Sequence, residues 1–340
     1  GYVYGDSTCG QRALYEVGMT GLPVVNVNNN CSTGSTALFL ARQAVETGAV
    51  DCALAVGFEQ MEAGALTTKY VDRPSPFDRF DEESAALVGM PDVALALRYF
   101  GGAGISHMKK YGTTREQIAA VTAKNSRHGA LNPRAQFQTA MTVEEVLAAR
   151  EIVWPLTLPM CSPIGDGAAA LVIVSERKAR AMGLSRRVRV LSSALVSGFD
   201  ADAEGRSVGA FAVNAAYEAA GLGPQDLSLA EVHDASATSE IVAYEYLGIC
   251  DKGGGGRLVE DGVTALGGRI PVNASGGLLR KGHPIGATGA AQIVELTEQL
   301  LGRSDARQVQ GARIGLAHNG GGMIGTDAAA TVVSILGLET

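Results

Sequence analysis

The 340-residue sequence lacks features that mark several whole classes of protein. It has no run of about 18 apolar residues and no signal-peptide pattern, so it predicts neither a membrane span nor secretion. Its 28 Lys and Arg are outnumbered by 35 Asp and Glu, and this net charge of −7 leaves no electrostatic footprint for nucleic acid. The five cysteines are odd in number and have no paired spacing, which favours free thiols in a reducing compartment such as the cytoplasm.

The sequence is also poor in aromatic residues, at 5%, and in recognisable ligand motifs. No metal-ligand spacing of His and Cys and no nucleotide-binding glycine loop occurs, so we expect no metal and no resident cofactor. What is abundant is small and apolar: hydrophobic residues make up 46% of the chain, and 44 residues are glycine. Such a composition is typical of an α/β protein in which helices and strands pack closely.

Hydrophobic periodicity predicts alternating strands and helices, and hence sheets sandwiched between helices. A more polar stretch that contains six prolines, 63–160, is predicted to be an insertion covering a site, with helices over 114–125 and 143–149. The other predicted elements are strands over 22–27, 51–56, 165–174, 188–196, 227–233 and 269–273, and helices after Cys31 and over 208–220 and 236–247.

Two internal matches indicate that the chain repeats itself. The segment that starts at Gly286, GATGAAQIV, has the same order of small and apolar residues as CSTGSTALF from Cys31. The segment IGDGAAALVIV from Ile164 likewise matches IGTDAAATVVS from Ile324. We therefore predict two similar halves: the first, 1–62 plus 161–185, is interrupted by the insertion, and the second is 186–340.

Cys31 stands between an apolar run and the first turn of a predicted helix. Unpaired backbone N–H groups and the helix dipole favour a thiolate at such a place, which predicts a pKa for this thiol below its free value. Small neighbours leave room for an acyl group. A buried structural cysteine explains the segment equally well, and the segment alone leaves both interpretations open.

Four segments in a fixed order then resemble the thiolases: NVNNNCSTGS around Cys31, HDAS from His233, GHPIGATG around His283, and HNGGG from His318. The resemblance is closest to the sterol-carrier-protein thiolases and related lipid-transfer proteins. It implies two βαβαβαββ halves stacked in a five-layer αβαβα sandwich, assembled as a homodimer or a dimer of dimers. Members of this family begin with roughly fifty further residues, so we expect this chain to start inside the fold.

The resemblance also implies roles for individual residues. Cys31 matches the cysteine that accepts the acyl group, and His283 matches the histidine that activates it. His233 matches the residue that orients a water in the enolate-stabilising oxyanion hole. In HNGGG, the N–H of Gly320 would join that of Cys31 in a second oxyanion hole, with Asn319 beside it.

One departure from the family pattern concerns the second catalytic cysteine. Many thiolases carry it where this chain has His318, and the sterol-carrier branch supplies it in an HDCF segment, where this chain has Ala235. An imidazole can shuttle protons near neutral pH, so His318 is the predicted substitute.

The resemblance implies an acyl-CoA C-acyltransferase that performs thiolysis or Claisen condensation through an acyl-Cys31 intermediate, with coenzyme A only as substrate carrier. Such an enzyme is expected in the cytoplasm, or in the peroxisome of a eukaryote. A decarboxylating ketosynthase with a Cys31, His233 and His283 site is one alternative. The other is a non-catalytic acyl-CoA or lipid carrier, or a subunit that needs a partner. Acyl chain length and metabolic direction are left open.

The remaining polar residues weigh less. Cys161 and Cys250 are more typical of buried apolar positions than of a site, and His107 and His128 are predicted at the surface. Basic residues are candidates for binding the phosphates of coenzyme A: Lys69, Arg73, Lys109, Lys110, Arg127, Arg280 and Lys281.

Overall fold

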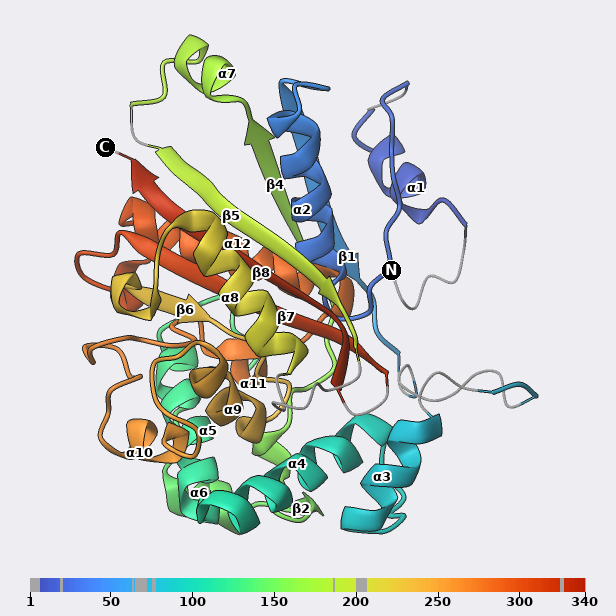
Figure 1. Ribbon diagram of the computed structural model, residues 1–340, viewed down its shortest axis with the longest axis vertical. Helices are drawn as coiled ribbons and strands as arrows, with labels where there is room; N and C mark the ends of the chain where they lie inside the picture. The colour runs from blue at the N-terminus through green and yellow to red at the C-terminus, as the bar shows by residue number, and fades with distance from the viewer. Residues whose placement is uncertain are drawn as a thin grey trace.

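The computed structural model describes residues 7–18, 21–62, 64, 72–74, 78–185, 187–199, 207–324 and 327–339. Figure 1 shows an upper α/β part and a lower, mostly helical part. The strands are β1 (Cys52–Glu59), β2 (Glu151–Val153), β3 (Leu156–Thr157), β4 (Gly167–Val174), β5 (Arg187–Ser197), β6 (Leu229–Glu231), β7 (Ile314–Ile324) and β8 (Asp327–Glu339). The helices are α1 (Cys9–Tyr15), α2 (Thr33–Glu46), α3 (Asp78–Val88), α4 (Leu95–Tyr111), α5 (Arg115–Ala130), α6 (Val143–Ala148), α7 (Glu176–Ala181), α8 (Val208–Ala220), α9 (Ala237–Tyr246), α10 (Gly255–Glu260), α11 (Gly277–Lys281) and α12 (Ile285–Leu301).

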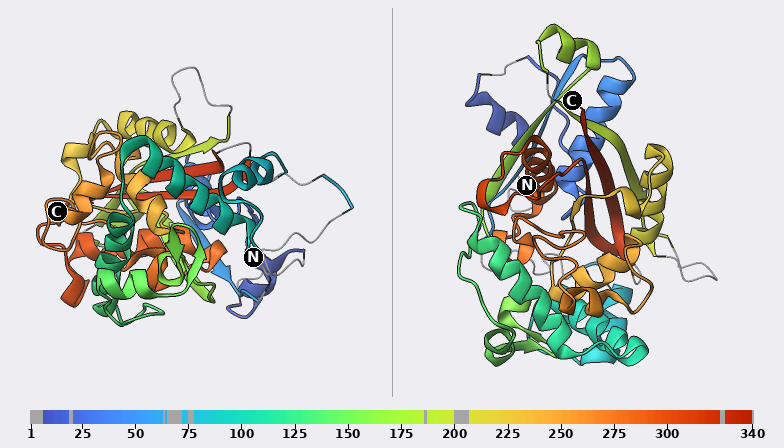
Figure 2. Two further views of the ribbon diagram at one scale, coloured as in Figure 1. Left: turned by 90° about the horizontal axis from the view of Figure 1, so that it is seen from below. Right: turned by 90° about the vertical axis from the view of Figure 1, so that its left-hand side faces the viewer.

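Two sheets enclose a central helical layer. The larger sheet has the order β5-β8-β7-β6, and the smaller one pairs β1 with β4. Helices α2 and α12 contact both sheets and each other, and α8 covers the outer face of the larger sheet (Figures 1 and 2). The outer face of the β1–β4 pair is exposed at Leu54 and Val172, so the described residues form four layers of the predicted five.

The predicted repeat is visible in the topology. Helix α2 leads into β1, which pairs antiparallel with β4, and α12 leads into β7, which pairs antiparallel with β8. Gly34 and Gly289, matched in the sequence comparison, pack reciprocally. A Cβ on Gly34 would lie 2.7 Å from the backbone nitrogen of Ala290, and one on Gly289 would lie 2.1 Å from Oγ of Ser35. Glycine is therefore required where the two central helices meet, and their close approach brings their N-terminal ends together.

Two predicted strands are wrong. Residues 23–28 form no strand and have no strand partner among the described residues, and Val25 is 77% exposed. Of the predicted strand 269–273, only Val272 forms an isolated bridge, to Ala230. In both segments the apolar pattern is present, but a strand also needs a neighbour that pairs along its length. The other predicted strands and helices are confirmed with shifted ends.

The stretch predicted as an insertion supplies helices α3 to α6, which form most of the lower part of Figure 1. Thr114 and Gln117 make the predicted capping box at the start of α5. His107 and His128 are buried here, so their predicted surface position is wrong. His107 bonds Glu245 and Thr113, and His128 bonds the carbonyl of Asn273 and the N–H of Leu266. All of these partners except Thr113 lie more than 130 residues from the histidines, which is why sequence alone suggested solvent.

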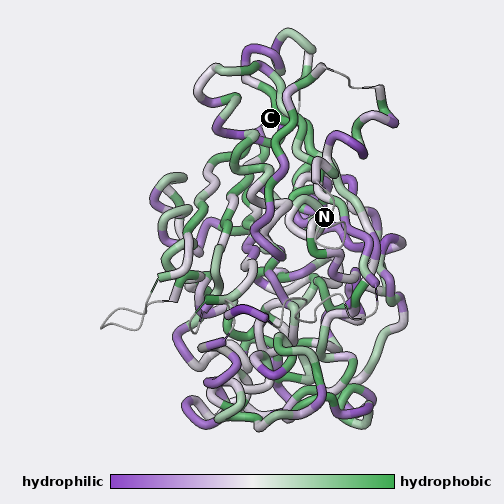
Figure 3. The backbone as a smooth tube through the Cα atoms, turned by 90° about the vertical axis from the view of Figure 1, so that its right-hand side faces the viewer, coloured by the Kyte–Doolittle hydropathy of each residue, from purple (hydrophilic) through white to green (hydrophobic). Residues whose placement is uncertain are grey.

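Hydropathy follows this division of the molecule. Figure 3 shows apolar residues along much of the strands, with polar stretches in loops along the outside. Buried apolar side chains form one cluster beneath the larger sheet and a second between the two sheets, around α2 and α12. The second cluster, which includes Leu38, Ile293 and Leu296, holds the central helices in place behind the site.

Candidate active site

Cys31 lies just before α2, in a turn whose geometry is set by asparagines. Asn30 has a left-handed backbone, with φ of 52°, and its side-chain oxygen accepts from both the backbone N–H (2.8 Å) and the thiol (3.0 Å) of Cys31. With its amide oriented to satisfy its neighbours, Asn319 donates to the carbonyl of Cys31 at 2.9 Å and accepts from the N–H of Gly289 at 3.3 Å. Asn319 thereby ties β7 to the Cys31 turn and to α12, and its predicted oxyanion role stays a prediction.

The fold brings Cys31, His233 and His283 together. The thiol sulfur and one nitrogen of each ring all lie within 4.8 Å of one another. The two imidazoles meet edge to face, with their centroids 5.2 Å apart. Cys31 and His283 each precede a central helix by two residues, and His233 follows β6. The close packing of α2 against α12 thus brings residues from distant parts of the chain into one cluster.

Thr288, in the first turns of α12, orients the ring of His283. Its hydroxyl donates to the carbonyl of Pro284 at 3.0 Å, so the same oxygen accepts the Nδ1–H of His283 at 2.7 Å. The other nitrogen, Nε2, is buried and has no partner. In this tautomer Nε2 carries a free lone pair, the requirement for a group that accepts a proton from a thiol.

Burial controls the protonation of the cluster. Desolvation raises the pKa of the Cys31 thiol from 9.0 to about 12, so the predicted lowering is wrong. The same effect lowers the pKa of His283 to about 4 and that of His233 well below 6.5. The neighbouring histidines lower the pKa of His233 further, because they disfavour a positive charge on its ring. At neutral pH the site holds a thiol and two neutral imidazoles, so the thiol needs a base in order to react.

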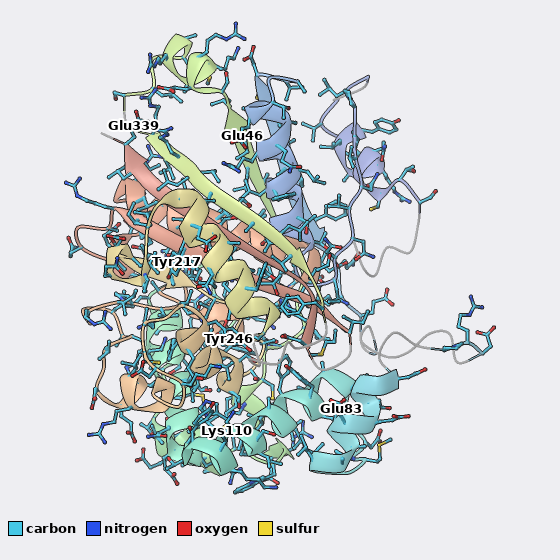
Figure 4. The ribbon with its side chains drawn as sticks, in the orientation of Figure 1. Glu46, Glu83, Lys110, Tyr217, Tyr246 and Glu339 are labelled. Carbon is cyan, nitrogen blue, oxygen red and sulfur yellow. The ribbon has the colours of Figure 1, made fainter. Side chains whose placement is uncertain are left out.

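His318 lies on β7, outside the three-residue cluster but close enough to disfavour a charge on His233. Its ring is 8% exposed, its Nδ1 has no hydrogen-bond partner, and burial lowers its pKa to about 4. The ring of Tyr246, labelled near the centre of Figure 4, lies 6.2 Å away. His318 therefore provides a third neutral imidazole with a free ring nitrogen beside His233 and His283.

The glycines that follow His318 differ in what surrounds them. A Cβ on Gly321 would lie 2.1 Å from the carbonyl oxygen of Asn29, so this glycine is needed for packing. A Cβ on Gly320 would meet only ordinary contacts at 3.7 Å or more, one of them the ring of His233. Protein packing therefore does not require glycine at 320. The backbone N–H groups that interact with the Cys31 thiol are those of Gly322 and of Cys31 itself.

Sequence analysis overlooked Asp234, which joins the His233 and His283 segments. Its carboxylate accepts from the N–H of Leu278 (2.7 Å) and the amide of Asn125 (2.9 Å). A Cβ on Gly277 would lie 2.1 Å from the same carboxylate. Asp234 therefore anchors the start of α11, the short helix that leads into His283. An acidic residue next to a candidate histidine was the available signal.

The candidate phosphate-binding residues divide into buried and exposed groups. Arg280 is 5% exposed and donates to the carbonyl of Thr139, so it is part of the interior. Lys281 is partly buried, and its Nζ lies 3.7 Å from Oε2 of Glu231. Lys69 lies outside the described residues. A cavity of about 460 Å³ is lined by Lys281, Arg134 and the two neighbours of His283, Gly282 and Pro284.

Among the described residues, no other cysteine belongs to a cluster of this kind. Cys161 is buried and donates to the carbonyl of Thr157, and Cys250 is partly buried. In the part of the chain that is described, no helix has both the length and the apolar character to cross a membrane.

A repeated α/β sandwich that holds a cysteine and histidines at the ends of its central helices is an arrangement suited to chemistry on a thiol. Family models agree with this class: "Thiolase, N-terminal domain" matches residues 4–150, and "Thiolase C-terminal domain-like" matches residues 202–337. The chain belongs to the thiolase family, and the predicted thiolase fold is confirmed.

Individual relatives place the chain within that family. It is 45% identical over 329 residues to sterol carrier protein 2 of Oryctolagus cuniculus, an alignment that covers 94% of this chain and 60% of the relative. It is 42% identical over 317 residues to acetyl-CoA acetyltransferase of Methanothermobacter thermautotrophicus, covering 92% and 80%. A solved structure, the Ltp2-ChsH2(DUF35) aldolase, has a TM-score of 0.79 at 24% identity, covering 98% of this chain and 85% of the other, and shows the shared fold.

Proposed function

We propose that this protein is an acyl-CoA C-acyltransferase that works through a thioester on Cys31. The observation that carries this proposal is the cluster in which the thiol lies within 4.8 Å of two imidazole nitrogens. The relative named acetyl-CoA acetyltransferase supports the same reaction class. The chain spans 60% of the length of its sterol carrier protein 2 relatives, so activities of the whole of those proteins stay outside this proposal.

In the proposed first half-reaction, Nε2 of His283 accepts the proton of the Cys31 thiol as sulfur attacks the thioester carbonyl. The tetrahedral oxyanion collapses, the bond to the sulfur of coenzyme A breaks, and the leaving thiolate takes the proton back from His283. The product is acyl-Cys31 and free coenzyme A. The tautomer held by Thr288 supports this role, since it leaves Nε2 ready to accept.

In the proposed second half-reaction, His318 removes a proton from the α-carbon of a second acyl-CoA. His233 helps to stabilise the enolate oxygen, and the α-carbon attacks the acyl-Cys31 carbonyl to form a carbon–carbon bond. The tetrahedral intermediate then collapses, the carbon–sulfur bond to Cys31 breaks, and the departing thiolate takes up the proton that His318 removed. The Nδ1 of His318, which has no hydrogen-bond partner, supports this assignment. Thiolysis is the same sequence in reverse.

Mass spectrometry of the intact protein and its peptides after incubation with acetyl-CoA tests the proposal. We expect a 1:1 acetyl adduct on Cys31 that is absent from Cys31→Ala. Cys161→Ser is the matched control, because Cys161 is buried outside the cluster, and it should acetylate normally. Acetylation of a different cysteine, or none in the wild type, would refute the proposal.

A decarboxylating condensation is a second candidate, which the pairing of one cysteine with two histidines favours. Here loss of CO₂ from a malonyl thioester generates the enolate, so no base is needed at the α-carbon. With malonyl-CoA as the donor, such an enzyme would not depend on His318. An acyltransferase of the thiolase type would need His318 and would accept acetyl-CoA as the donor.

We also propose that the chain forms a homodimer. Residues 23–28 pair with no strand among the described residues, and Leu22 and Val25 are 60% and 77% exposed next to the Cys31 turn. An unpaired apolar segment of this kind is suited to pairing with its symmetry mate. Light scattering should give twice the monomer mass at micromolar concentration, and Val25→Lys should lower it. A monomeric wild type would contradict the proposal.

A further inference from the structure

The cluster of Cys31, His233 and His283 has the donor set of a zinc site. One sulfur and two imidazole nitrogens lie within 4.8 Å of one another. Around a tetrahedral Zn²⁺, bonds of about 2.0–2.3 Å place the donors roughly 3.3–3.8 Å apart. The observed separations are therefore within reach of a shared ion after small side-chain rotations.

The donors are also available to an ion. Nε2 of His233 and Nε2 of His283 are buried and have no hydrogen-bond partner. Nδ1 of His283 is bonded to Thr288, which fixes the plane of the ring and leaves Nε2 free, as in many metal-ligating histidines. The thiol of Cys31 donates to the amide oxygen of Asn30, a bond that loss of its proton would release, and the backbone N–H of Gly322 also interacts with the sulfur.

We propose that this cluster binds a zinc ion and that zinc competes with acyl groups for Cys31. Binding replaces the thiol proton with a zinc–sulfur bond and releases that proton to solvent. Two zinc–nitrogen bonds form to the histidines, and a water occupies the fourth position. A zinc-bound sulfur has no free thiolate for attack on a thioester, so the ion is an inhibitor and not a cofactor.

This assignment differs from the expectation drawn from sequence, which contains no metal-ligand spacing around Cys31. The three ligands come from before α2, after β6 and before α12, so only the fold brings them together. The binding itself does not depend on the proposed acyltransferase function, whereas the inhibition rests on it.

Titration of the full chain with zinc chloride by calorimetry, without any acyl-CoA, tests the binding. We expect one tight site per chain, which cadmium occupies and magnesium does not. Cys31→Ala and His283→Gln should each weaken zinc binding by at least about 10- to 100-fold, since loss even of outer-shell partners has that effect. Cys52→Ser is the matched control: Cys52 is an exposed thiol away from the cluster, and its loss should leave the tight site unchanged.

A measurement on the wild type avoids dependence on folded variants. Zinc should protect Cys31 from iodoacetamide in peptide mass spectrometry, while Cys52 is alkylated at the same rate with and without the metal. Equal zinc affinity in Cys31→Ala, alkylation of Cys31 unaffected by zinc, or loss of the site in Cys52→Ser would each overturn the assignment. If zinc binds but acetyl-CoA never labels Cys31, the metal site stands and the proposed function fails.

Discussion

Thr288→Val tests the orientation of the proposed base most directly. Valine has nearly the shape of threonine but lacks the oxygen that accepts the Nδ1–H of His283 at 2.7 Å. In the variant, either Nδ1–H is buried without a partner, or the proton moves to Nε2 and the base loses its lone pair. A buried unsatisfied donor costs about 1–3 kcal/mol. Converted at about 1.4 kcal/mol per factor of ten, this predicts a fall in the acylation rate of roughly 5- to 150-fold.

The assay is the single-turnover rate of Cys31 acylation by acetyl-CoA, followed by mass spectrometry. Thr288→Ser keeps the oxygen and should restore most of the wild-type rate, which separates the hydrogen bond from general packing. Nitrogen NMR of labelled histidine should show the Nδ1–H tautomer of His283 in the wild type and in Thr288→Ser. Equal acylation rates for Thr288→Val and the wild type, or equally slow rates for both variants, would refute the reasoning.

Three further predictions concern chemistry, packing and pH. His318→Ala should leave acylation of Cys31 intact but abolish exchange of α-protons of acetyl-CoA with D₂O; unchanged exchange would mean that another group is the base. Gly289→Ala should destabilise the fold by about 1–3 kcal/mol in urea unfolding, because the added Cβ would overlap Ser35. In the control Gly102→Ala, the added Cβ meets only the Leu87 side chain, so this variant should be neutral or stabilising. Equal effects of the two substitutions would contradict the packing argument. Burial lowers the pKa of His128 from 6.5 to about 3, so on acidification the unfolded chain takes up a proton here before the folded protein does. The free energy of unfolding therefore falls as the pH drops below 6.5, by about 1.4 kcal/mol for this residue at pH 5.5. His128→Gln should lose less stability on acidification, and a loss equal to that of the wild type would exclude His128 as a source of the acid sensitivity.

Sequence was sufficient for most of the fold because the two halves share local patterns that packing did not override. Hydrophobic periodicity correctly predicts the helix after Cys31, the helices α5, α8 and α9, and the strands that match between the two halves. The prediction for the segment 22–27 failed for a physical reason: its apolar residues satisfy a strand pattern, but no strand among the described residues pairs with it. A pattern reports which face is apolar and does not report what covers it.

The candidate site was predictable as a set of motifs but not as a geometry. Cys31, His233 and His283 could be named from their segments, and the structure brings them within 4.8 Å. Thr288 and Asp234 could not be ranked, because their value depends on which backbone or ring atoms they meet. Thr288 matters because its hydroxyl proton is already used on the carbonyl of Pro284, and Asp234 matters because α11 starts against it.

The state of Cys31 shows how two opposing effects compare in magnitude. A position at a helix start favours a thiolate by about 0.3–1 kcal/mol, and by about 2 in partly buried geometries. The rise in the thiol pKa from 9.0 to about 12 corresponds to roughly 4 kcal/mol in the opposite direction, so desolvation outweighs the helix dipole. A resting thiol of this kind has little reactivity until a base removes its proton during attack. The reactivity of Cys31 therefore depends on its pairing with His283, and any ligand that occupies the lone pair of His283, a proton or a metal ion, switches the nucleophile off.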